Sequence, residues 1–365
     1  MKIIHCADIH LDSPFTRLGD TEKKKERKAE LIKAFKMMIS HASKEDVRAV
    51  IIAGDLFDQS HVSATAKNAV LASVRENPDI DFFFLKGNHD KCDFPCETDD
   101  IPDNFHMFSG EWQTYDLGEN VFITGIELNR DNAQGIYSKL NLDVTHFNIV
   151  TMHGQDAVTL RKDGAQTISI RDLKNKNIDY LALGHIHSYK EEKLDGRGTY
   201  CYPGCLESRG YDETGDHGFV VLDINGPERT YTAKKECNPI RESHVLPVDI
   251  SGLVNSSEIL LKTDLKLREN RFSSRDMVKV ELIGQVDFEC EKNPDFIEKQ
   301  LEDRYYDFKL KDNTGYKVDY DDFRFDESLK GEFIRTVESQ EEITEEDKAE
   351  IIRIGIKALL GEEIE

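Results

Sequence analysis

The sequence KIIHCADIH, residues 2–10, joins a short apolar segment to an aspartate and a histidine two positions apart. The segment Lys2–Ala7 predicts a buried β-strand because apolar and β-branched residues dominate it. Residues i and i+2 of an extended chain point to the same side, so we expect Asp8 and His10 to grip one metal ion together. The stretch therefore predicts a strand that runs into a metal-binding site.

Further apolar runs alternate with helical patterns, and this alternation of strands and helices is typical of an α/β fold. The segments predicted as buried strands are 47–53, 82–85, 121–126, 148–152 and 180–183. Between the first two strands, apolar residues from Leu31 to Ile39 recur at helical spacing behind the charged run Glu22–Lys28. We interpret that run as the solvated face of a helix.

Five short polar motifs follow these strands. They are Asp8-Ile9-His10, Gly54-Asp55-Leu56-Phe57-Asp58, Gly87-Asn88-His89-Asp90, Met152-His153-Gly154 and Gly184-His185-Ile186-His187. Each motif alone is a common chance pattern. Together they fall at the carboxyl ends of predicted strands, the edge of an open α/β sheet at which ligands bind. Their joint placement predicts a single site.

The residue types in these motifs suit two divalent metal ions. The expected ligands are Asp8, His10, Asp55, Asn88, His153, His185 and His187. Carboxylate, imidazole and amide-carbonyl groups favour Mn²⁺, Fe²⁺ or Zn²⁺, and Mn²⁺ is the expected ion. His185 and His187 could each serve a different ion, while Asp55 could bridge both ions with its two oxygens.

The remaining motif residues have other expected roles. His89 is placed to stabilise the transition state or to donate a proton to the leaving oxygen. Gly54 and Gly87 are expected to permit tight turns and a close approach by phosphate. These roles are those of a phosphoester hydrolase.

Composition limits the class of protein. The 365-residue chain has no apolar run of the length needed to span a membrane, and its seven cysteines are thinly spread. We therefore expect a cytoplasmic protein with reduced thiols. The net charge of −23 argues against nucleic acid as a partner, but residues 236–365 carry −14 of it and residues 1–235 only −9.

The predicted site can attract phosphate despite this charge. Two divalent ions beside two carboxylates leave a local charge of about +2. Basic residues that follow the strand ending at His153 could contact a DNA backbone, although a solvated surface is the simpler explanation for each. They are Arg161, Lys162, Arg171, Lys174 and Lys176.

The motif set resembles that of the calcineurin-like metallophosphoesterase superfamily. The opening residues 5–15 are similar to those of its bacterial DNA-repair exonucleases of the SbcD and YhaO type. The resemblance implies a metallophosphoesterase β-sandwich flanked by helices. It also implies that Asp8, His10, Asp55 and His187 hold a first metal, while Asp55, Asn88, His153 and His185 hold a second.

The resemblance implies two catalytic residues outside the ligand set. His89 would be the catalytic histidine. Asp58 stands where the archaeal and eukaryotic break-repair nucleases of the family have a second histidine, and it would orient His89 through a hydrogen bond. This departure favours exonuclease over endonuclease activity.

The C-terminal part of the chain has a different pattern. A β-rich run at 277–286, a helical stretch at 295–304 and a strand-like segment at 305–310 predict a small α+β capping domain over 241–330, after a nuclease domain over 1–240. Thr344 predicts the start of a terminal helix within 331–365. Its apolar stripe, Ile352, Ile356, Leu359 and Leu360, could pack on the chain's own core or dock a partner.

The sequence thus predicts a two-metal-dependent DNA phosphodiester hydrolase, an exonuclease acting in DNA repair. The resemblance implies an SMC-like coiled-coil ATPase subunit as a partner, and a homodimer is compatible with the sequence. Two other functions stay open: a phosphoesterase of cyclic or small nucleotides, and a non-catalytic scaffold subunit that binds DNA ends. The intact ligand set argues against the scaffold.

Overall fold

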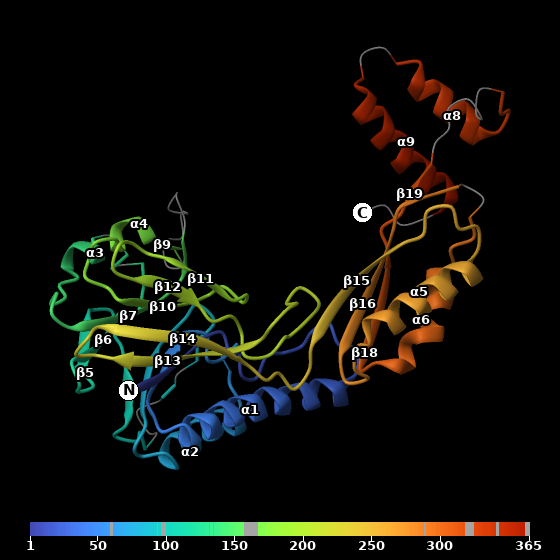
Figure 1. The fold of residues 1–365 in the computed structure, drawn as a ribbon. Helices are drawn as coiled ribbons and strands as arrows, with labels where there is room; N and C mark the ends of the chain where they lie inside the picture. The colour runs from blue at the N-terminus through green and yellow to red at the C-terminus, as the bar shows by residue number, and fades with distance from the viewer. Residues whose placement is uncertain are drawn as a thin grey trace. The chain divides into compact units, whose positions relative to one another are not determined.

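The computed structural model divides the chain into two compact units, Met1–Ser243 and His244–Glu365. The residues it describes are 1–58, 61–92, 94–95, 100–130, 132–133, 135–156, 167–287, 290–317, 325–340 and 343–361. Figure 1 shows both units and labels many of their helices and strands. Among the described residues, no helix is both long and apolar enough to cross a membrane.

The first unit is built on two six-stranded sheets. One has the order β14-β13-β1-β2-β3-β4, in which β1 to β4 are parallel and β13 runs antiparallel to both of its neighbours. Its strands are β1 (Lys2–Cys6), β2 (Val47–Ala53), β3 (Asp81–Leu85), β4 (Phe105–Met107), β13 (Gly218–Asn225) and β14 (Thr230–Cys237). Each of the first three predicted strands therefore lies within one residue of its expected bounds.

The second sheet has the order β11-β12-β10-β7-β6-β5, with a parallel centre and antiparallel edge strands. Its strands are β5 (Gln113–Asp116), β6 (Val121–Gly125), β7 (Phe147–His153), β10 (Tyr180–Gly184), β11 (Lys190–Lys193) and β12 (Thr199–Tyr202). The short strands β8 (Gln155–Asp156) and β9 (Thr167–Ile168) pair with each other.

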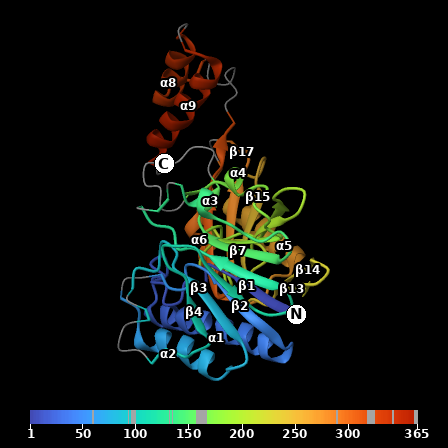
Figure 2. The same cartoon turned by 90° about the vertical axis from the view of Figure 1, so that its left-hand side faces the viewer.

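The two sheets pack face to face with helices outside them. Successive residues of β1 face different layers. Ile3 packs in a cluster shared with the second sheet, and Ile4 packs in a cluster shared with the helices. Helices α1 (Thr21–Lys44) and α2 (Ala64–Arg75) cover the first sheet, and α3 (Ile136–Lys139) and α4 (Ile170–Leu173) cover the second. Figures 1 and 2 show this arrangement. The predicted α/β class is confirmed.

Helix α1 departs from the prediction of a solvated charged face. Asp20 caps it by accepting a hydrogen bond from the Glu22 backbone N–H, at 2.7 Å. Arg27, however, is fully buried and pairs with Glu30, whose carboxylate also accepts a hydrogen bond from Arg241 at 3.3 Å. The prediction was wrong at Arg27, because a charge run shows no periodicity that marks one member as buried.

The second unit is a small α+β assembly. A three-stranded sheet has the order β15-β16-β18, and helices α5 and α6 contribute to the same apolar cluster. Its elements are β15 (Ser243–Asp249), α5 (Ser256–Asn270), β16 (Met277–Ile283), β17 (Gln285–Val286), α6 (Pro294–Leu301), η1 (Glu302–Arg304), β18 (Asp307–Asp312) and β19 (Gly315–Tyr316). Gly284, at φ +104°, separates β16 from β17 within the predicted 277–286 run.

Two further helices, α8 (Leu329–Glu338) and α9 (Glu345–Leu360), pack on each other. Thr344 begins α9 as expected, because its hydroxyl accepts a hydrogen bond from the Asp347 backbone N–H at 3.1 Å. Ile352 and Ile356 are fully buried, so the chain's own residues cover this half of the apolar stripe. Leu359 is exposed, and the Leu360 side chain lies outside the described residues.

Candidate metal centre

The structure brings every predicted ligand to one end of the two sheets. Asp8 and His10 follow β1, Asp55 follows β2, Asn88 follows β3, His153 ends β7, and His185 and His187 follow β10. Within each sheet these strands are parallel, so their carboxyl ends open at the same edge. The topology therefore explains how residues from 8 to 187 meet.

The backbone at Asp8 and His10 is not extended, so the expected strand geometry was wrong, although both side chains belong to one group of potential ligands. Both residues have left-handed φ values, 51° and 49°, and Asp55 has 52°. Hydrogen bonds hold this turn, from the Asp8 N–H to Gly54 O at 3.1 Å and from the His10 N–H to Asp55 O at 3.0 Å. Such a conformation costs about 1–3 kcal/mol per residue and is common at functional sites.

Asp8, His10 and His187 form a first group of potential ligands. One donor atom from each lies within 4.8 Å of the others. The two imidazoles of this group approach each other closely, with 3.2 Å between His10 Nε2 and His187 Nε2. Asp55 Oδ2 lies 3.9 Å from the same His10 nitrogen, so Asp55 borders this group as well.

Asp55, His153 and His185 form a second group of the same size. Asn88 completes it, since its Oδ1 lies 3.1 Å from His153 Nε2 and 3.0 Å from His185 Nδ1. Asp55 Oδ2 lies 3.4 Å from His153 Nε2. Asp55 thus stands between both groups, in the position that a bridging ligand needs.

Hydrogen bonds on the outer side of two imidazoles fix which nitrogen faces the site. His153 Nδ1 donates to Ala53 O at 2.8 Å, and His187 Nδ1 donates to Glu213 Oε1 at 2.7 Å. These assignments turn both Nε2 atoms toward the site, where His153 Nε2 faces the Asp55 and Asn88 oxygens and His187 Nε2 faces His10 Nε2. When these imidazoles are unprotonated, their nitrogens and the facing oxygens are all electron-pair donors, so the residues present fit divalent metal ions.

The pKa shifts of the buried site residues also favour a bound cation. Burial and the neighbouring Asp55 carboxylate raise the pKa of Asp8 to about 6. Burial would lower the pKa of His153, yet the charges of Asp55 and Asp8 raise it to about 9. The two carboxylates therefore stabilise positive charge on His153, as they would on a bound metal ion.

The motif glycines make room for neighbouring ligand side chains. A Cβ on Gly54 would lie 2.3 Å from His153 Nδ1, and one on Gly87 would lie 2.2 Å from Asp55 Oδ1. Gly54 also has a φ of +91°, which a side chain rarely permits. The predicted turn at Gly54 is therefore found, and both glycines leave space that His153 and Asp55 occupy.

His89 and Asp58 lie in direct contact beside the first group. His89 Nδ1 is 2.6 Å from Asp58 Oδ1, and the His89 side chain is 43% exposed. The hydrogen bond to Asp58 raises the pKa of His89, which favours its protonated form. His10, Asp58 and His89 also have ligand spacing, with His10 Nδ1 at 3.4 Å from Asp58 Oδ1. The contact agrees with the orienting role expected for Asp58.

Sequence reasoning missed three residues that organise the site. Asp90 accepts backbone hydrogen bonds from Leu56 at 3.2 Å, Phe57 at 2.8 Å and Gly87 at 2.9 Å, and so ties two ligand loops together. The sequence could have indicated Asp90, because it belongs to the third motif, Gly87-Asn88-His89-Asp90. Arg209 and Glu213 follow no predicted strand, and nothing in their spacing marked them.

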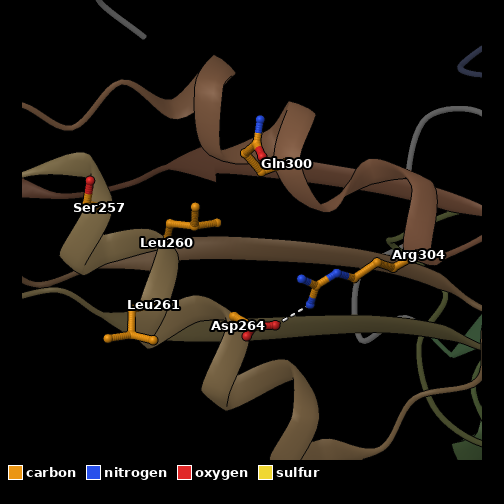
Figure 3. Close-up of a pocket in the computed structure, with 6 residues that line it drawn as sticks. All are labelled: Ser257, Leu260, Leu261, Asp264, Gln300 and Arg304. Atoms are coloured by element: carbon orange, nitrogen blue, oxygen red, sulfur yellow. Dashed lines mark hydrogen bonds and ion pairs between the residues drawn. The ribbon is translucent and has the colours of Figure 1, made fainter.

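The described basic residues expected to contact DNA, and the residues that line the pocket of the second unit, are not members of either ligand group. Arg161 and Lys162 are outside the described residues, while Arg171 and Lys174 are exposed. A surface pocket of about 290 Å³ lies in the second unit beside the Asp264–Arg304 ion pair (Figure 3). It contains none of the predicted site residues. Its lining is Ser257, Leu260, Leu261, Asp264, Gln300 and Arg304.

Comparison with known proteins agrees with the expected resemblance. YhaO of Bacillus subtilis, a metallophosphoesterase, is 26% identical over 285 residues, which cover 74% of this chain and 69% of that protein. The DNA double-strand break repair protein Mre11 of Sulfolobus acidocaldarius is 27% identical over 308 residues, covering 78% of this chain and 76% of that protein. The solved structure of TT1561 from Thermus thermophilus covers 64% of this chain and 98% of that one, with a TM-score of 0.41 and 11% identity. Residues 1–189 match the model of the calcineurin-like phosphoesterases, and the chain belongs to that family.

Proposed function

We propose that this protein is a two-metal-dependent DNA phosphodiester hydrolase that acts as an exonuclease in DNA repair in the cytoplasm. The observation that carries the proposal is the convergence of carboxylate, imidazole and amide acceptors, with the His89–Asp58 pair beside them. The relatives named Mre11 support DNA as the substrate class. Two divalent ions, with Mn²⁺ expected, would lower the pKa of water and stabilise charge on the phosphate.

The chain's own residues would position the reaction. Asp8, His10, Asp55 and His187 would hold one ion, and Asp55, Asn88, His153 and His185 the other. Protonated His89, exposed and oriented by Asp58, would donate a proton to the leaving oxygen or a hydrogen bond to the transition state. The left-handed turns fix these groups before substrate arrives.

A comparison of substrates tests the proposal. With Mn²⁺ present, we expect cutting of end-labelled linear duplex DNA, little cutting of closed circular DNA, and slow hydrolysis of bis-p-nitrophenyl phosphate. Hydrolysis of cyclic nucleotides without any cutting of DNA would favour the small-nucleotide alternative. Binding of DNA ends without hydrolysis of any phosphodiester would identify a scaffold.

The pH dependence should respond to Asp58→Asn. Asp58 raises the pKa of His89, and the protonated form is the one we assign to catalysis. Activity should fall as pH rises through that pKa, so Asp58→Asn should move this alkaline limb to lower pH and reduce kcat by about 10–100-fold. Profiles of kcat against pH would measure the shift. An unmoved limb would mean that His89 is not the titrating acid.

We also propose that α8 and α9 dock the SMC-like coiled-coil ATPase expected from the resemblance. Ile352 and Ile356 of the predicted apolar stripe are buried and therefore cannot contact a partner. Leu329 of α8 and Leu359 of α9, however, are 68% and 43% exposed. Exposed leucines suit an apolar face of a partner helix. The surplus of acid in this third of the chain repels DNA and suits a protein partner.

The double variant Leu329→Ser/Leu359→Ser should stay folded and hydrolyse bis-p-nitrophenyl phosphate, yet lose co-purification with the ATPase and any ATP-stimulated DNA cutting. Leu261→Ser is the matched control, because Leu261 is 61% exposed on α5 of the same unit. Co-purification that survives the double variant would place the interface elsewhere.

A further inference from the structure

Arg209 lies between two carboxylates at the edge of the metal centre. Its Nη1 donates to Asp58 Oδ2 at 3.1 Å, while its Nη2 and Nε donate to Glu213 Oε1 at 2.7 Å and 3.1 Å. The side chain is only 17% exposed. A guanidinium carries its donors in a fixed planar fork, so these contacts define the separation of the two carboxylates.

Each of these carboxylates contacts the Nδ1 of a functional histidine, and Asp58 also lies 3.4 Å from His10 Nδ1. Asp58 contacts His89 Nδ1 at 2.6 Å, and Glu213 contacts His187 Nδ1 at 2.7 Å. Arg209 Nη2 itself lies 3.2 Å from His187 Nδ1. A continuous series of contacts therefore runs from the expected acid to an expected ligand of the first ion, with Arg209 at its centre.

The segment that carries Arg209 is held on several sides. The Arg209 backbone N–H donates to Glu213 Oε2 at 2.7 Å, and the Ser208 hydroxyl donates to Glu213 O at 2.7 Å. Buried Arg27 of α1 donates to Ser208 O. These bonds fix the loop on which the guanidinium stands, so Arg209 is preorganised and its position does not depend on a bound substrate.

We propose that Arg209 is a positioning residue that sets the separation of His89 and His187 by bridging Asp58 and Glu213. The inference rests on the proposed function, because it assumes that both histidines serve one phosphodiester. Arg209 would act through the two carboxylates, because each of its three guanidinium nitrogens donates to one of them. Without the guanidinium, the two carboxylates would repel each other and move apart. His89 and His187, which they contact, would then move as well.

Three variants test the role. Arg209→Ala should lower kcat for bis-p-nitrophenyl phosphate by about 100-fold with little change in KM, the size expected when reacting groups shift by about 1 Å. Arg209→Lys should recover only part of this loss, because an ammonium cannot bridge two carboxylates with a planar fork. Arg17→Ala is the matched control. Arg17 pairs with Asp212 of the same loop at 2.7 Å, but both side chains are largely exposed, so activity should stay within about two-fold.

A second readout does not require activity. In protein without added metal, the ¹⁵N and ¹H signals of the His89 and His187 rings should both shift in Arg209→Ala and in Arg209→Lys, while those of His244 in the second unit stay unchanged. Guanidinium ion added to Arg209→Ala should restore part of kcat. If the native protein hydrolyses no phosphodiester, the proposed function fails, and the ring signals still decide whether Arg209 positions the histidines.

The proposal is overturned by ring signals that stay unchanged in a folded Arg209 variant. It is also overturned if KM alone rises, because Arg209 would then contact substrate. If Arg209→Ala does not fold, Arg209→Lys decides the matter by the same two measurements.

Discussion

Chelation of divalent metal should abolish hydrolysis by this protein, and added Mn²⁺ should restore it. Carboxylate, imidazole and amide groups converge in both ligand groups, and such a set binds divalent metal ions, which would supply the nucleophile. Activity on bis-p-nitrophenyl phosphate would be followed during titration with EDTA and then with Mn²⁺. Binding should saturate near two ions per chain by calorimetry.

Substitution of Asp55 tests whether the two ligand groups bind the metal ions together. It borders both ligand groups, so Asp55→Ala should weaken the binding of both ions, whereas Asn88→Ala should weaken mainly one. Variants of exposed carboxylates such as Asp212 should bind two ions normally. Full activity in EDTA would exclude the two-metal mechanism.

His89→Ala should lower kcat by about 10²–10⁴-fold, the range measured for acid–base and electrostatic groups. The number of bound metal ions should stay near two, because His89 contacts Asp58 and stands outside the two groups assigned to the ions. Single-turnover rates and metal content would be measured on the same preparation.

The geometry also allows a second role for His89, as a metal ligand, and the metal content of His89→Ala distinguishes the two roles. His10, Asp58 and His89 lie at ligand spacing, so His89 could hold a metal in place of acting on the substrate. Loss of one ion in His89→Ala would make it a ligand. Retention of both ions with a large loss of kcat would leave the catalytic assignment standing.

The sequence predicted the architecture because strand ends carry a strong signal. Buried parallel strands are continuous apolar runs, and a polar residue directly after such a run marks the open edge of the sheet. This pattern located Asp55 after β2 and His153 at the end of β7, and both meet in one ligand group. Residues that end strands were therefore the easiest to place.

The parts that could not be predicted depend on tertiary contacts with no local pattern. The left-handed turns at Asp8 and His10 are held by backbone bonds to the loop after β2, so the first motif alone suggested an extended segment. Arg209 and Glu213 lie in a loop without periodicity. Helix α5 was missed, since its buried positions, Ile259, Thr263 and Leu267, form a narrow stripe among charged residues.

The buried pairing of Glu30 with Arg27 and Arg241 bears on where the first unit can be cut for expression. Arg241 and Ser243 lie at its C-terminal end, and the Ser243 hydroxyl is 2.5 Å from that of Ser208, the neighbour of Arg209. A fragment ending at residue 240 would strip Glu30 of one cationic partner inside the protein, and breaking a buried pair costs about 3–5 kcal/mol. It would also remove the Ser243 hydroxyl that contacts Ser208, next to Arg209. An isolated first unit should therefore extend through Ser243, because the last residues before the second unit stabilise the first.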